Sequence, residues 1–316
     1  MSEAENTTPV AKAEVSFGDK LQSLPKPWLY LILILITSLP QFFPVPLPNK
    51  PNKASEDLFH LLTTIPVDKP VLIGSDWTNS TRGESGGEFK SLVRILMRRN
   101  IKFAVYGFDP QAPQVVKDVI RNLNAEAKAN GQKEYLVWND WVSIGYFPNA
   151  EGTVNAINNN VRSAFADKKS PDDSGKMQPV MSSPVLKNVK SVSDFSCLIV
   201  ATASNTSNVT IERITKVPLA MMVTGVMGPE TQVYYDSGQL KGLAIGLKGC
   251  YDLETLMASY KDPATGADWS GKQYVNMDNG AKYYPTLHLA LLLMIGAVVA
   301  GNVGMLLTRK KGGPRA

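Results

Sequence analysis

Residues 284–307 form a long, predominantly apolar stretch, and no formally charged residue follows it until Arg309. A helix rises about 1.5 Å per residue, so this stretch can cross a hydrocarbon layer about 30 Å thick. Residues 308–316 then carry four positive charges and no negative one. Basic flanks of this kind stay on the cytoplasmic side. We therefore predict a C-terminal transmembrane helix at 284–307 and a basic cytoplasmic tail at 308–316.

A second apolar run lies within residues 27–47, after a polar arm at residues 1–26 that we expect to be flexible. Two interpretations stay open. A cleaved signal peptide would explain the short apolar core, but the long arm and the lack of a small-x-small cleavage site favour an uncleaved transmembrane anchor. The anchor helix should end at Pro40, and the apolar continuation at residues 42–48 would complete the crossing or lie at the interface.

Basic residues around the two apolar runs predict their orientation. Near the first run, Lys20 and Lys26 on one side are opposed by Lys50 and Lys53 on the other, so the bias there is weak. At the second run only Lys282 opposes the four positive charges of the tail. We therefore expect both termini to be cytoplasmic and residues 48–283 to lie on the periplasmic or extracellular side of the cell (inner) membrane.

Between the two runs, short apolar segments alternate with segments of helical periodicity. Predicted strands are residues 71–74, 101–108, 135–138, 195–202 and 219–223. Predicted helices are residues 88–99, 114–130, 153–165, 209–215, 228–243 and 251–260. This alternation is typical of an α/β fold, so we expect residues 48–283 to form one parallel, doubly wound domain, Rossmann-like or flavodoxin-like. Residues 167–190 are polar and rich in proline, which predicts a loop insertion or lid.

Composition narrows the class of protein. With 44% hydrophobic and 19% charged residues, the chain is too apolar to be disordered and too mixed to be a polytopic transporter. The net charge is +5, of which the tail supplies four, so the rest is nearly neutral and we expect no nucleic-acid partner. Two cysteines, Cys197 and Cys250, are too few for a disulfide scaffold, and whether they pair stays open.

The loop at residues 75–87 is the richest in candidate chemistry, because it follows a predicted strand and leads into a predicted helix. Open parallel sheets bind ligands beyond the carboxyl ends of their strands, and helix N-termini attract anions. One hypothesis is therefore a small-anion site. The other is an ordinary helix entry, with Ser85 as N-cap and Glu88 as its capping-box partner. The candidate ligand-binding residues are Ser75, Asp76, Thr78, Ser80, Thr81, Glu84 and Asp140.

Asp76, Thr78 and Ser80 have the spacing Asp-x-Thr-x-Ser after a buried strand. This resembles the D-x-S-x-S metal-ion-dependent adhesion motif of von Willebrand A domains, with threonine replacing the first serine. The resemblance implies that these three residues ligate a divalent cation, with Asp140 as the one candidate for a supporting acid. Oxygen ligands of this kind suit Mg²⁺ or Ca²⁺. The match is too short to imply a fold, and we predict no other cofactor.

Catalytic motifs are not recognisable in this sequence. The chain has two histidines, His60 and His288, and no histidine–cysteine or histidine–carboxylate cluster, which disfavours zinc hydrolysis and triad hydrolysis. We expect His60 to be a partly buried helix residue and His288 an interfacial polar group. Enzymatic activity stays uncertain, and a non-enzymatic role is favoured.

The C-terminal apolar stretch carries small residues four positions apart. Such residues form a flat face that another helix can approach closely, and an asparagine in a membrane needs a hydrogen-bond partner. This pattern predicts helix packing, either with another protein or with the chain's own first span. The candidate helix-packing residues are Gly296, Ala297, Ala300, Gly301, Asn302 and Gly304.

Residues 237–243 read Ser-Gly-Gln-Leu-Lys-Gly-Leu. This stretch resembles the S-G-Q-L-x-G-L core of a set of uncharacterised prokaryotic proteins, which are α/β domains tethered by a C-terminal membrane helix. The resemblance implies the same architecture. It implies no reaction, substrate or functional residue.

Together these patterns predict a two-span protein that acts as a non-catalytic structural or accessory subunit of a larger membrane protein complex. The expected partners are the lipid bilayer and other membrane protein subunits, including further copies of this chain in a homo-oligomer. The alternative is an extracytoplasmic ligand-binding or sensory domain that binds a small anion or a divalent cation at the 75–87 loop.

Overall fold

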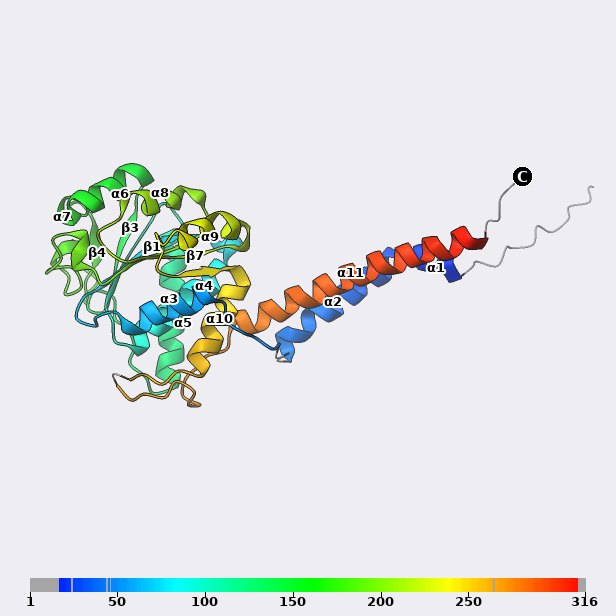
Figure 1. Cartoon of the computed structure of the whole chain (residues 1–316). Helices are drawn as coiled ribbons and strands as arrows, with labels where there is room; N and C mark the ends of the chain where they lie inside the picture. Colours follow the sequence, from blue (N-terminus) through cyan, green and yellow to red (C-terminus); the bar gives the residue numbers. More distant parts are fainter. Residues whose placement is uncertain (1–16, 24, 44, 46, 264, 312–316) are drawn as a thin grey trace, which may run out of the picture. The chain divides into compact units, whose positions relative to one another are not determined.

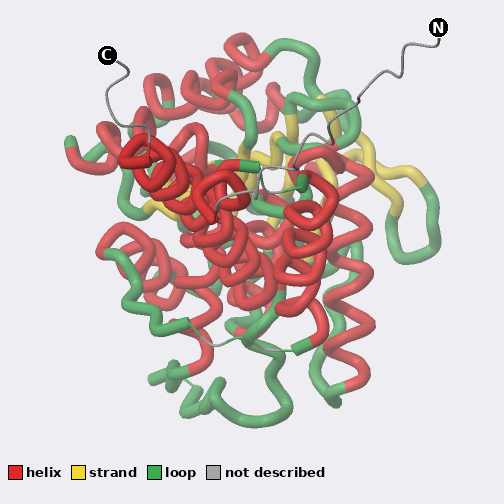
Figure 2. The backbone as a smooth tube through the Cα atoms, turned by 90° about the vertical axis from the view of Figure 1, so that its right-hand side faces the viewer, coloured by secondary structure: helices red, strands yellow, loops and turns green. Residues whose placement is uncertain are grey.

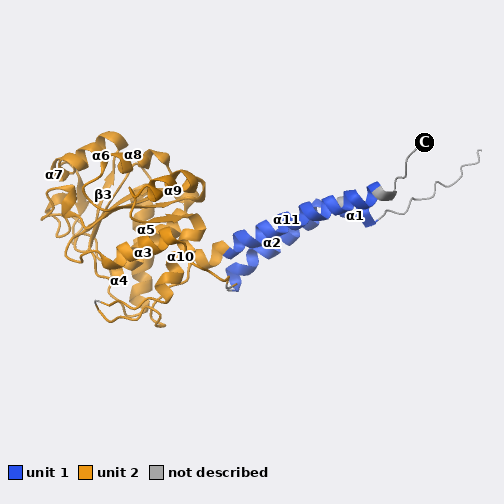
Figure 3. Cartoon of the chain, in the orientation of Figure 1, with its two compact units in different colours: residues 1–44, 285–316 blue, residues 45–284 orange. Residues whose placement is uncertain are grey.

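The computed structural model describes residues 17–23, 25–43, 45, 47–263 and 265–311 (Figure 1). The chain divides into two compact units, one made of residues 1–44 with 285–316 and the other of residues 45–284 (Figure 3). The second, larger unit holds the α/β domain.

A six-stranded parallel sheet forms the centre of the larger unit. Its strands are β1 (Val71–Asp76), β2 (Phe103–Gly107), β3 (Trp141–Tyr146), β6 (Leu198–Thr202), β7 (Leu219–Val223) and β8 (Leu243–Ile245). The spatial order is β3-β2-β1-β6-β7-β8. Leu72 of β1 pairs with Ala104 of β2 on one side and with Leu198 of β6 on the other. The predicted α/β fold is confirmed, and its strand order is Rossmann-like.

Successive residues of a strand point to opposite faces of the sheet, and nearly all strand residues here are buried. Both faces of the sheet are therefore covered by helices. Ile73 packs in the hydrophobic cluster on one face, and Leu72 in the cluster on the other. The first face carries α3 (Lys53–Thr64), α4 (Ser85–Arg98), α5 (Ala112–Ala129) and α10 (Gly246–Ala258). The second carries α6 (Ala150–Asn159), α7 (Val161–Ala164), α8 (Val209–Arg213) and α9 (Gly228–Asp236). Figure 2 shows the strands lying among the helices.

The third strand lies later in the chain than predicted, so the strand expected at residues 135–138 is wrong. Two short apolar runs flank Asn139 and Asp140, and their pattern alone does not decide which one joins the sheet. Tyr135 fills the core instead, with its hydroxyl 3.1 Å from the carbonyl oxygen of Leu96. Trp138 adopts a φ of 75°, which is incompatible with a strand.

The helix predicted at residues 228–243 ends early, and a short strand, β8, begins at the last of these residues. α9 ends at Asp236, and Gly238 then turns the chain with a φ of 78°. β8 pairs in parallel with β7, and α10 begins immediately after it at Gly246, earlier than the predicted residue 251. The apolar residues of a three-residue strand cannot be told from those of a helix that follows directly. The sequence pattern therefore did not reveal β8.

The insertion at residues 167–190 is packed against the domain. It contains an antiparallel hairpin of β4 (Lys169–Pro171) and β5 (Met177–Pro179). Val180 and Leu186 are fully buried in the core. The end of the insertion lies beside the segments that precede β1 and β2, at the amino edge of the sheet.

The smaller unit contains α1 (Phe17–Gln22), α2 (Lys26–Phe42) and most of α11 (Asn279–Lys311). Among the described residues one helix, Asn279–Arg309, is long and apolar enough to span a membrane, whereas α2 is a shorter apolar helix.

The structure also revises the ends of the predicted membrane segments. α2 continues through Pro40, where the sequence predicts its end, and closes with the N–H of Phe43 donating to the carbonyl of Leu39 at 2.9 Å. Residues 1–16 of the predicted arm and 312–316 of the predicted tail lie outside the described residues.

Candidate functional site

The loops after β1, β6 and β7 surround a hollow of about 740 Å³ at the carboxyl edge of the sheet. We call this hollow the edge crevice. Its wall includes Ser80, Thr81 and Glu84 after β1, Ser204 and Thr206 after β6, and Thr224 after β7. It lies where the strand order reverses, between β1 and β6, which is where open parallel sheets bind ligands. Three of the predicted candidate residues therefore line one hollow.

The hydroxyls at the start of the 75–87 loop hold the loop itself. Thr78 caps the 3₁₀ helix η1 (Asn79–Thr81), with its Oγ1 2.7 Å from the Ser80 hydroxyl oxygen and 3.3 Å from the Ser80 nitrogen. The Thr81 hydroxyl accepts the N–H of Thr78 at 3.3 Å and so completes a capping box. Thr78 and Ser80 therefore have a local structural role.

Asp76 ends β1 and is 6% exposed. Its Oδ2 accepts a hydrogen bond from the Ser207 hydroxyl at 3.1 Å. Burial raises the pKa of Asp76, and the hydrogen bond from Ser207 opposes that rise. The buried hydroxyl of Ser75 makes no hydrogen bond in the described part of the chain. Neither Ser75 nor Asp76 lines the edge crevice.

Asp140 is not part of this site. It precedes β3 and lies at the amino edge of the parallel sheet, whereas Asp76 ends β1 at the carboxyl edge. It accepts hydrogen bonds from the Lys133 ammonium (2.8 Å) and the Leu136 N–H (3.0 Å). The described residues contain no group of three or more His, Cys, Asp or Glu that could hold a metal ion. The prediction that Asp140 supports a cation at Asp76 is therefore wrong.

Glu84 joins two of the loops around the edge crevice. Its carboxylate accepts the N–H of Gly225 at 2.8 Å, which ties the loop after β1 to η5 (Gly225–Met227) after β7. One helical turn later, Glu88 is fully buried, and the backbone N–H of Gly246 lies near its carboxyl group. Burial, and then the charge of Glu84, raise the pKa of Glu88 well above its ordinary value. Glu88 thus stays neutral over a wider pH range than an exposed glutamate.

The predicted capping box of Ser85 and Glu88 is wrong. α4 begins at Ser85 with Glu84 as N-cap and without a side-chain cap, and the Ser85 hydroxyl makes no hydrogen bond within the described residues. The sequence did contain a signal for the burial of Glu88, because Leu92 and Ile95 follow it by four and seven positions on the apolar face of α4.

A second buried acid, Glu254 of α10, holds the start of α11. Its carboxylate accepts three backbone N–H groups, from Asp278 (3.0 Å), Gly280 (2.9 Å) and Ala281 (2.8 Å). The first N–H groups of a helix have no partner within the helix, so this carboxylate satisfies them and lies at the positive end of the helix dipole. Burial raises the pKa of Glu254, and the three N–H bonds oppose the rise.

Asp278, just before α11, joins an ion-pair network with α4 and α5. It pairs with Lys90 and lies 2.9 Å from Nη2 of Arg94, which also lies 2.6 Å from Oε2 of Glu126. Burial alone would raise the pKa of Asp278, but Lys90 and Arg94 together lower it. The start of α11 is therefore bound directly to α4 and α10, and through Arg94 it is linked to α5.

The two cysteines are free and buried, so the disulfide that the sequence left open is not formed. Cys197 directly precedes β6, and Cys250 lies in α10 with its sulfur 3.5 Å from Oε1 of Glu254. Burial raises the pKa of Cys197 to about 12 and that of Cys250 well above its ordinary value. Both thiols therefore behave as buried core groups rather than as reactive nucleophiles.

Near its C-terminal end, the predicted small-residue face of α11 packs against α1 within the smaller unit. Gly304 is buried, and a Cβ added to Gly18 of α1 would lie 3.0 Å from the Gly304 carbonyl oxygen. The half-buried members of the face are Ala297, Ala300 and Gly301, and the exposed ones are Gly296 and Asn302. Packing against the chain's own N-terminal helix therefore explains part of this face.

Comparisons with protein-family models, with curated proteins and with solved structures find no match. The stretch at residues 237–243, which resembles the S-G-Q-L-x-G-L core, connects α9 to β8. A Cβ at Gly242 would lie 2.4 Å from Cα of Leu58 in α3. This glycine is therefore required by the close approach of two backbones.

The lining of the edge crevice combines one carboxylate with hydroxyl and amide groups. The carboxylate is that of Glu84, and the lining contains no histidine or lysine that could activate one of its hydroxyls. The carboxylate repels anions, while the hydroxyls and amides can pair with alcohols, amides or amines. A small neutral or cationic polar ligand therefore fits this crevice better than the small anion expected from the sequence.

Proposed function

We propose that this protein is a membrane-anchored, non-catalytic α/β subunit of a larger membrane assembly, with residues 48–283 outside the cytoplasm and both termini inside. The observation that carries the proposal is the amide of Asn302, which is exposed on an apolar helix and has no hydrogen-bond partner among the described residues. An unpaired amide in hydrocarbon costs roughly 2–7 kcal/mol. A neighbouring helix that accepts and donates hydrogen bonds removes this cost.

The exposed surfaces of α2 and α11 support insertion in a bilayer. Large apolar side chains remain exposed along both helices, including Trp28, Ile34, Leu35, Leu292, Ile295 and Leu306. Continuous apolar surface of this kind is unfavourable in water and favourable against lipid.

Two contacts support a second span formed by the N-terminal helices. Gln41 lies 3.4 Å from Thr286, near the beginning of α11, whereas Gly18 lies close to Gly304, near its end. The chain segments therefore run antiparallel, as two spans on either side of one extramembrane domain must. The 17 residues of α2 cover only about 25 Å, so α1 would have to lengthen the N-terminal span.

The first turn of α11 belongs to the α/β domain. Glu254 and Asp278 bind this helix start to the domain through hydrogen bonds and ion pairs. A partner that packs against α11 in the membrane would therefore contact a helix whose first turn is part of the domain.

Purification of the full chain from native membranes in a mild detergent, followed by native mass measurement, tests this proposal. We expect a complex larger than the monomer. Asn302→Leu removes the amide at similar side-chain size and should release partners, whereas the matched change Val299→Leu on the same exposed helix should not. A monomer for the unmodified protein, or its recovery without detergent, would contradict the proposal.

The edge crevice favours a second candidate function, a membrane-anchored binding domain for a small neutral or cationic ligand. Its volume of about 740 Å³ is within the range of small-molecule sites. Its position at the reversal of strand order supports the same reading.

A further inference from the structure

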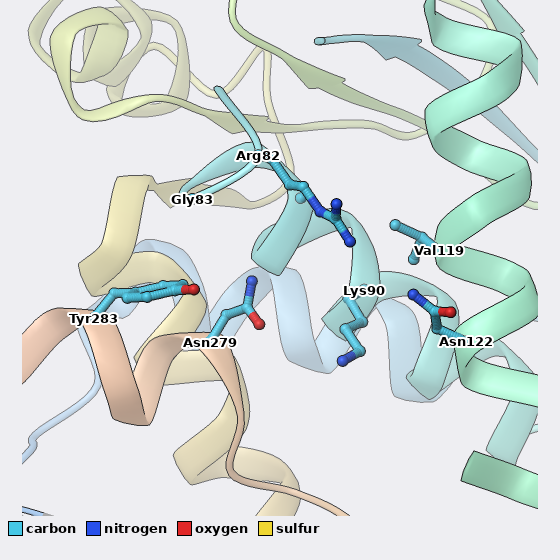
Figure 4. A pocket seen from close by; sticks show the side chains of 8 residues that line it. Arg82, Gly83, Lys90, Val119, Asn122, Asn279 and Tyr283 are labelled. Carbon is cyan, nitrogen blue, oxygen red and sulfur yellow. The ribbon is translucent and has the colours of Figure 1, made fainter. Parts of the chain in front are cut away.

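A second hollow, of about 370 Å³, also borders the 75–87 loop (Figure 4). We call it the basic pocket. Arg82 comes from the loop, Lys90 from α4, Asn122 from α5, and Asn279 and Tyr283 from the start of α11. All of these residues belong to the larger unit. Gly83 and Gly86 also line the pocket, and a Cβ on Gly86 would lie 3.1 Å from the Arg82 side chain.

The basic pocket has an excess of positive charge. Its lining contains two cations, Arg82 and Lys90, and no carboxylate. Arg82 forms no ion pair with any described residue, while Lys90 pairs with Asp278, which lies outside the lining. Glu254 already occupies the N–H groups at the start of α11, so the attraction for an anion comes from side chains and not from the helix dipole.

Three polar side chains in this pocket have unused hydrogen-bonding capacity. Within the described part of the chain, the amides of Asn122 and Asn279 and the hydroxyl of Tyr283 form no side-chain hydrogen bond. Figure 4 shows Asn279 and Tyr283 on the start of α11 and Asn122 on α5, with Arg82 on the 75–87 loop. The guanidinium group of an arginine can donate two hydrogen bonds to one phosphate group, and neutral amide and hydroxyl donors can bind its other oxygen atoms. These side chains therefore suit a tetrahedral anion.

We propose that the basic pocket binds a phosphate group, and that its source is the headgroup of an anionic phospholipid. The choice of source rests on the proposed membrane anchoring. Tyr283 lies in the second turn of α11, directly before the predicted apolar span, and Lys282 and Tyr284 flank it. Tyrosine and lysine at the end of a span are typical of the membrane interface, where headgroup phosphates lie.

The first arm of the test places the full chain in nanodiscs of phosphatidylcholine alone or of equal phosphatidylcholine and phosphatidylglycerol. Native mass measurement then counts the lipids that stay bound. We expect phosphatidylglycerol to be retained, and Arg82→Gln to lower its affinity at least about tenfold through loss of a charged fork. Tyr283→Phe, which removes one hydroxyl, should lower it less. Arg121→Gln is the matched control, because Arg121 is an exposed arginine on α5 outside the pocket.

The second arm measures thermal unfolding of the full chain in a nonionic detergent with increasing inorganic phosphate. Lipid retention that depends on Arg82, without an effect of phosphate, assigns the pocket to a lipid headgroup. Stabilisation by phosphate that depends on Arg82 assigns it to a soluble phosphate compound and still supports the phosphate site. Equal behaviour of Arg82→Gln and Arg121→Gln in both arms overturns the inference. Recovery of the protein without detergent would overturn the anchoring alone, and the phosphate arm would still test the pocket.

Discussion

The carboxylate of Glu254 in α10 accepts the backbone N–H of Gly280, in the first turn of α11, at 2.9 Å. Most helices receive such a cap from a residue immediately before them in the chain. Here the cap comes from another helix, and the same carboxylate also accepts the N–H groups of Asp278 and Ala281. The helix that we propose to enter the membrane is therefore anchored at its start by a buried acid of the α/β domain.

Glu254→Ala should lower the unfolding free energy of the domain by about 2–4 kcal/mol, because three N–H groups lose their acceptor and a buried cavity is created. Denaturant unfolding of the full chain in detergent, followed by tryptophan fluorescence, measures this change. Glu212→Ala, at an exposed position on α8, should change stability by no more than about 0.5 kcal/mol. Equal effects of the two variants would show that the cap contributes nothing.

Glu88→Gln should change how stability depends on pH. The pKa of Glu88 is higher in the folded than in the unfolded chain, so the unfolded chain releases this proton first as the pH rises. The unfolding free energy should therefore be highest below the ordinary glutamate pKa and fall, by about 1.4 kcal/mol per pH unit, up to the raised pKa. Glutamine stays neutral, so unfolding curves at several pH values should lose this component. An unchanged pH dependence would contradict the buried, neutral state of Glu88.

Gly242→Ala should destabilise the domain by at least about 3 kcal/mol, because the added Cβ would overlap the backbone of Leu58 and neither backbone can move freely. Gly83→Ala is the control, since a Cβ there has no atom within 4 Å. Thermal unfolding midpoints of the two variants measure the difference. Similar midpoints would mean that α3 is not packed on this segment as described.

Glu84→Gln tests the edge crevice as a binding site. A thermal-unfolding screen of the full chain with Mg²⁺, Ca²⁺, small amines and sugars should find compounds that raise the unfolding midpoint. For the cationic compounds the increase should disappear in Glu84→Gln, because the one carboxylate of the crevice is lost. Glu134→Gln, which changes a more exposed acid outside the crevice, should retain the increase. The same shifts in both variants would place the binding elsewhere.

Much of the sheet could be predicted because parallel strands buried on both faces are continuous apolar runs. Residues 219–223 coincide with β7, and residues 195–202 contain β6. β8 could not be predicted, because three apolar residues followed by a helix carry no signal that separates strand from helix. Because the third strand was predicted before Asp140 instead of after it, Asp140 was assigned to the carboxyl edge of the sheet, whereas it lies at the amino edge.

The candidate site was only partly predictable for a different reason. Sequence order indicates which residues follow β1, but not which side of the loop each one occupies. Glu84 lines the edge crevice, whereas Arg82, two residues earlier, lines the basic pocket. The contributions of Thr206, Asn122 and Tyr283 come from distant parts of the chain and depend on tertiary packing. No pattern within the 75–87 loop could reveal them.

The position of Asp278 determines where the globular part can be separated from its anchor. Truncation of the chain before Asp278 would remove the acid that pairs with both Lys90 and Arg94. It would also remove the three N–H groups that donate to the carboxylate of Glu254. A cut after Tyr284, combined with removal of the N-terminal helices α1 and α2, keeps those groups paired and removes only the apolar remainder of α11. A soluble fragment for crystallisation or binding assays must therefore retain the opening turns of the helix from which it is being released.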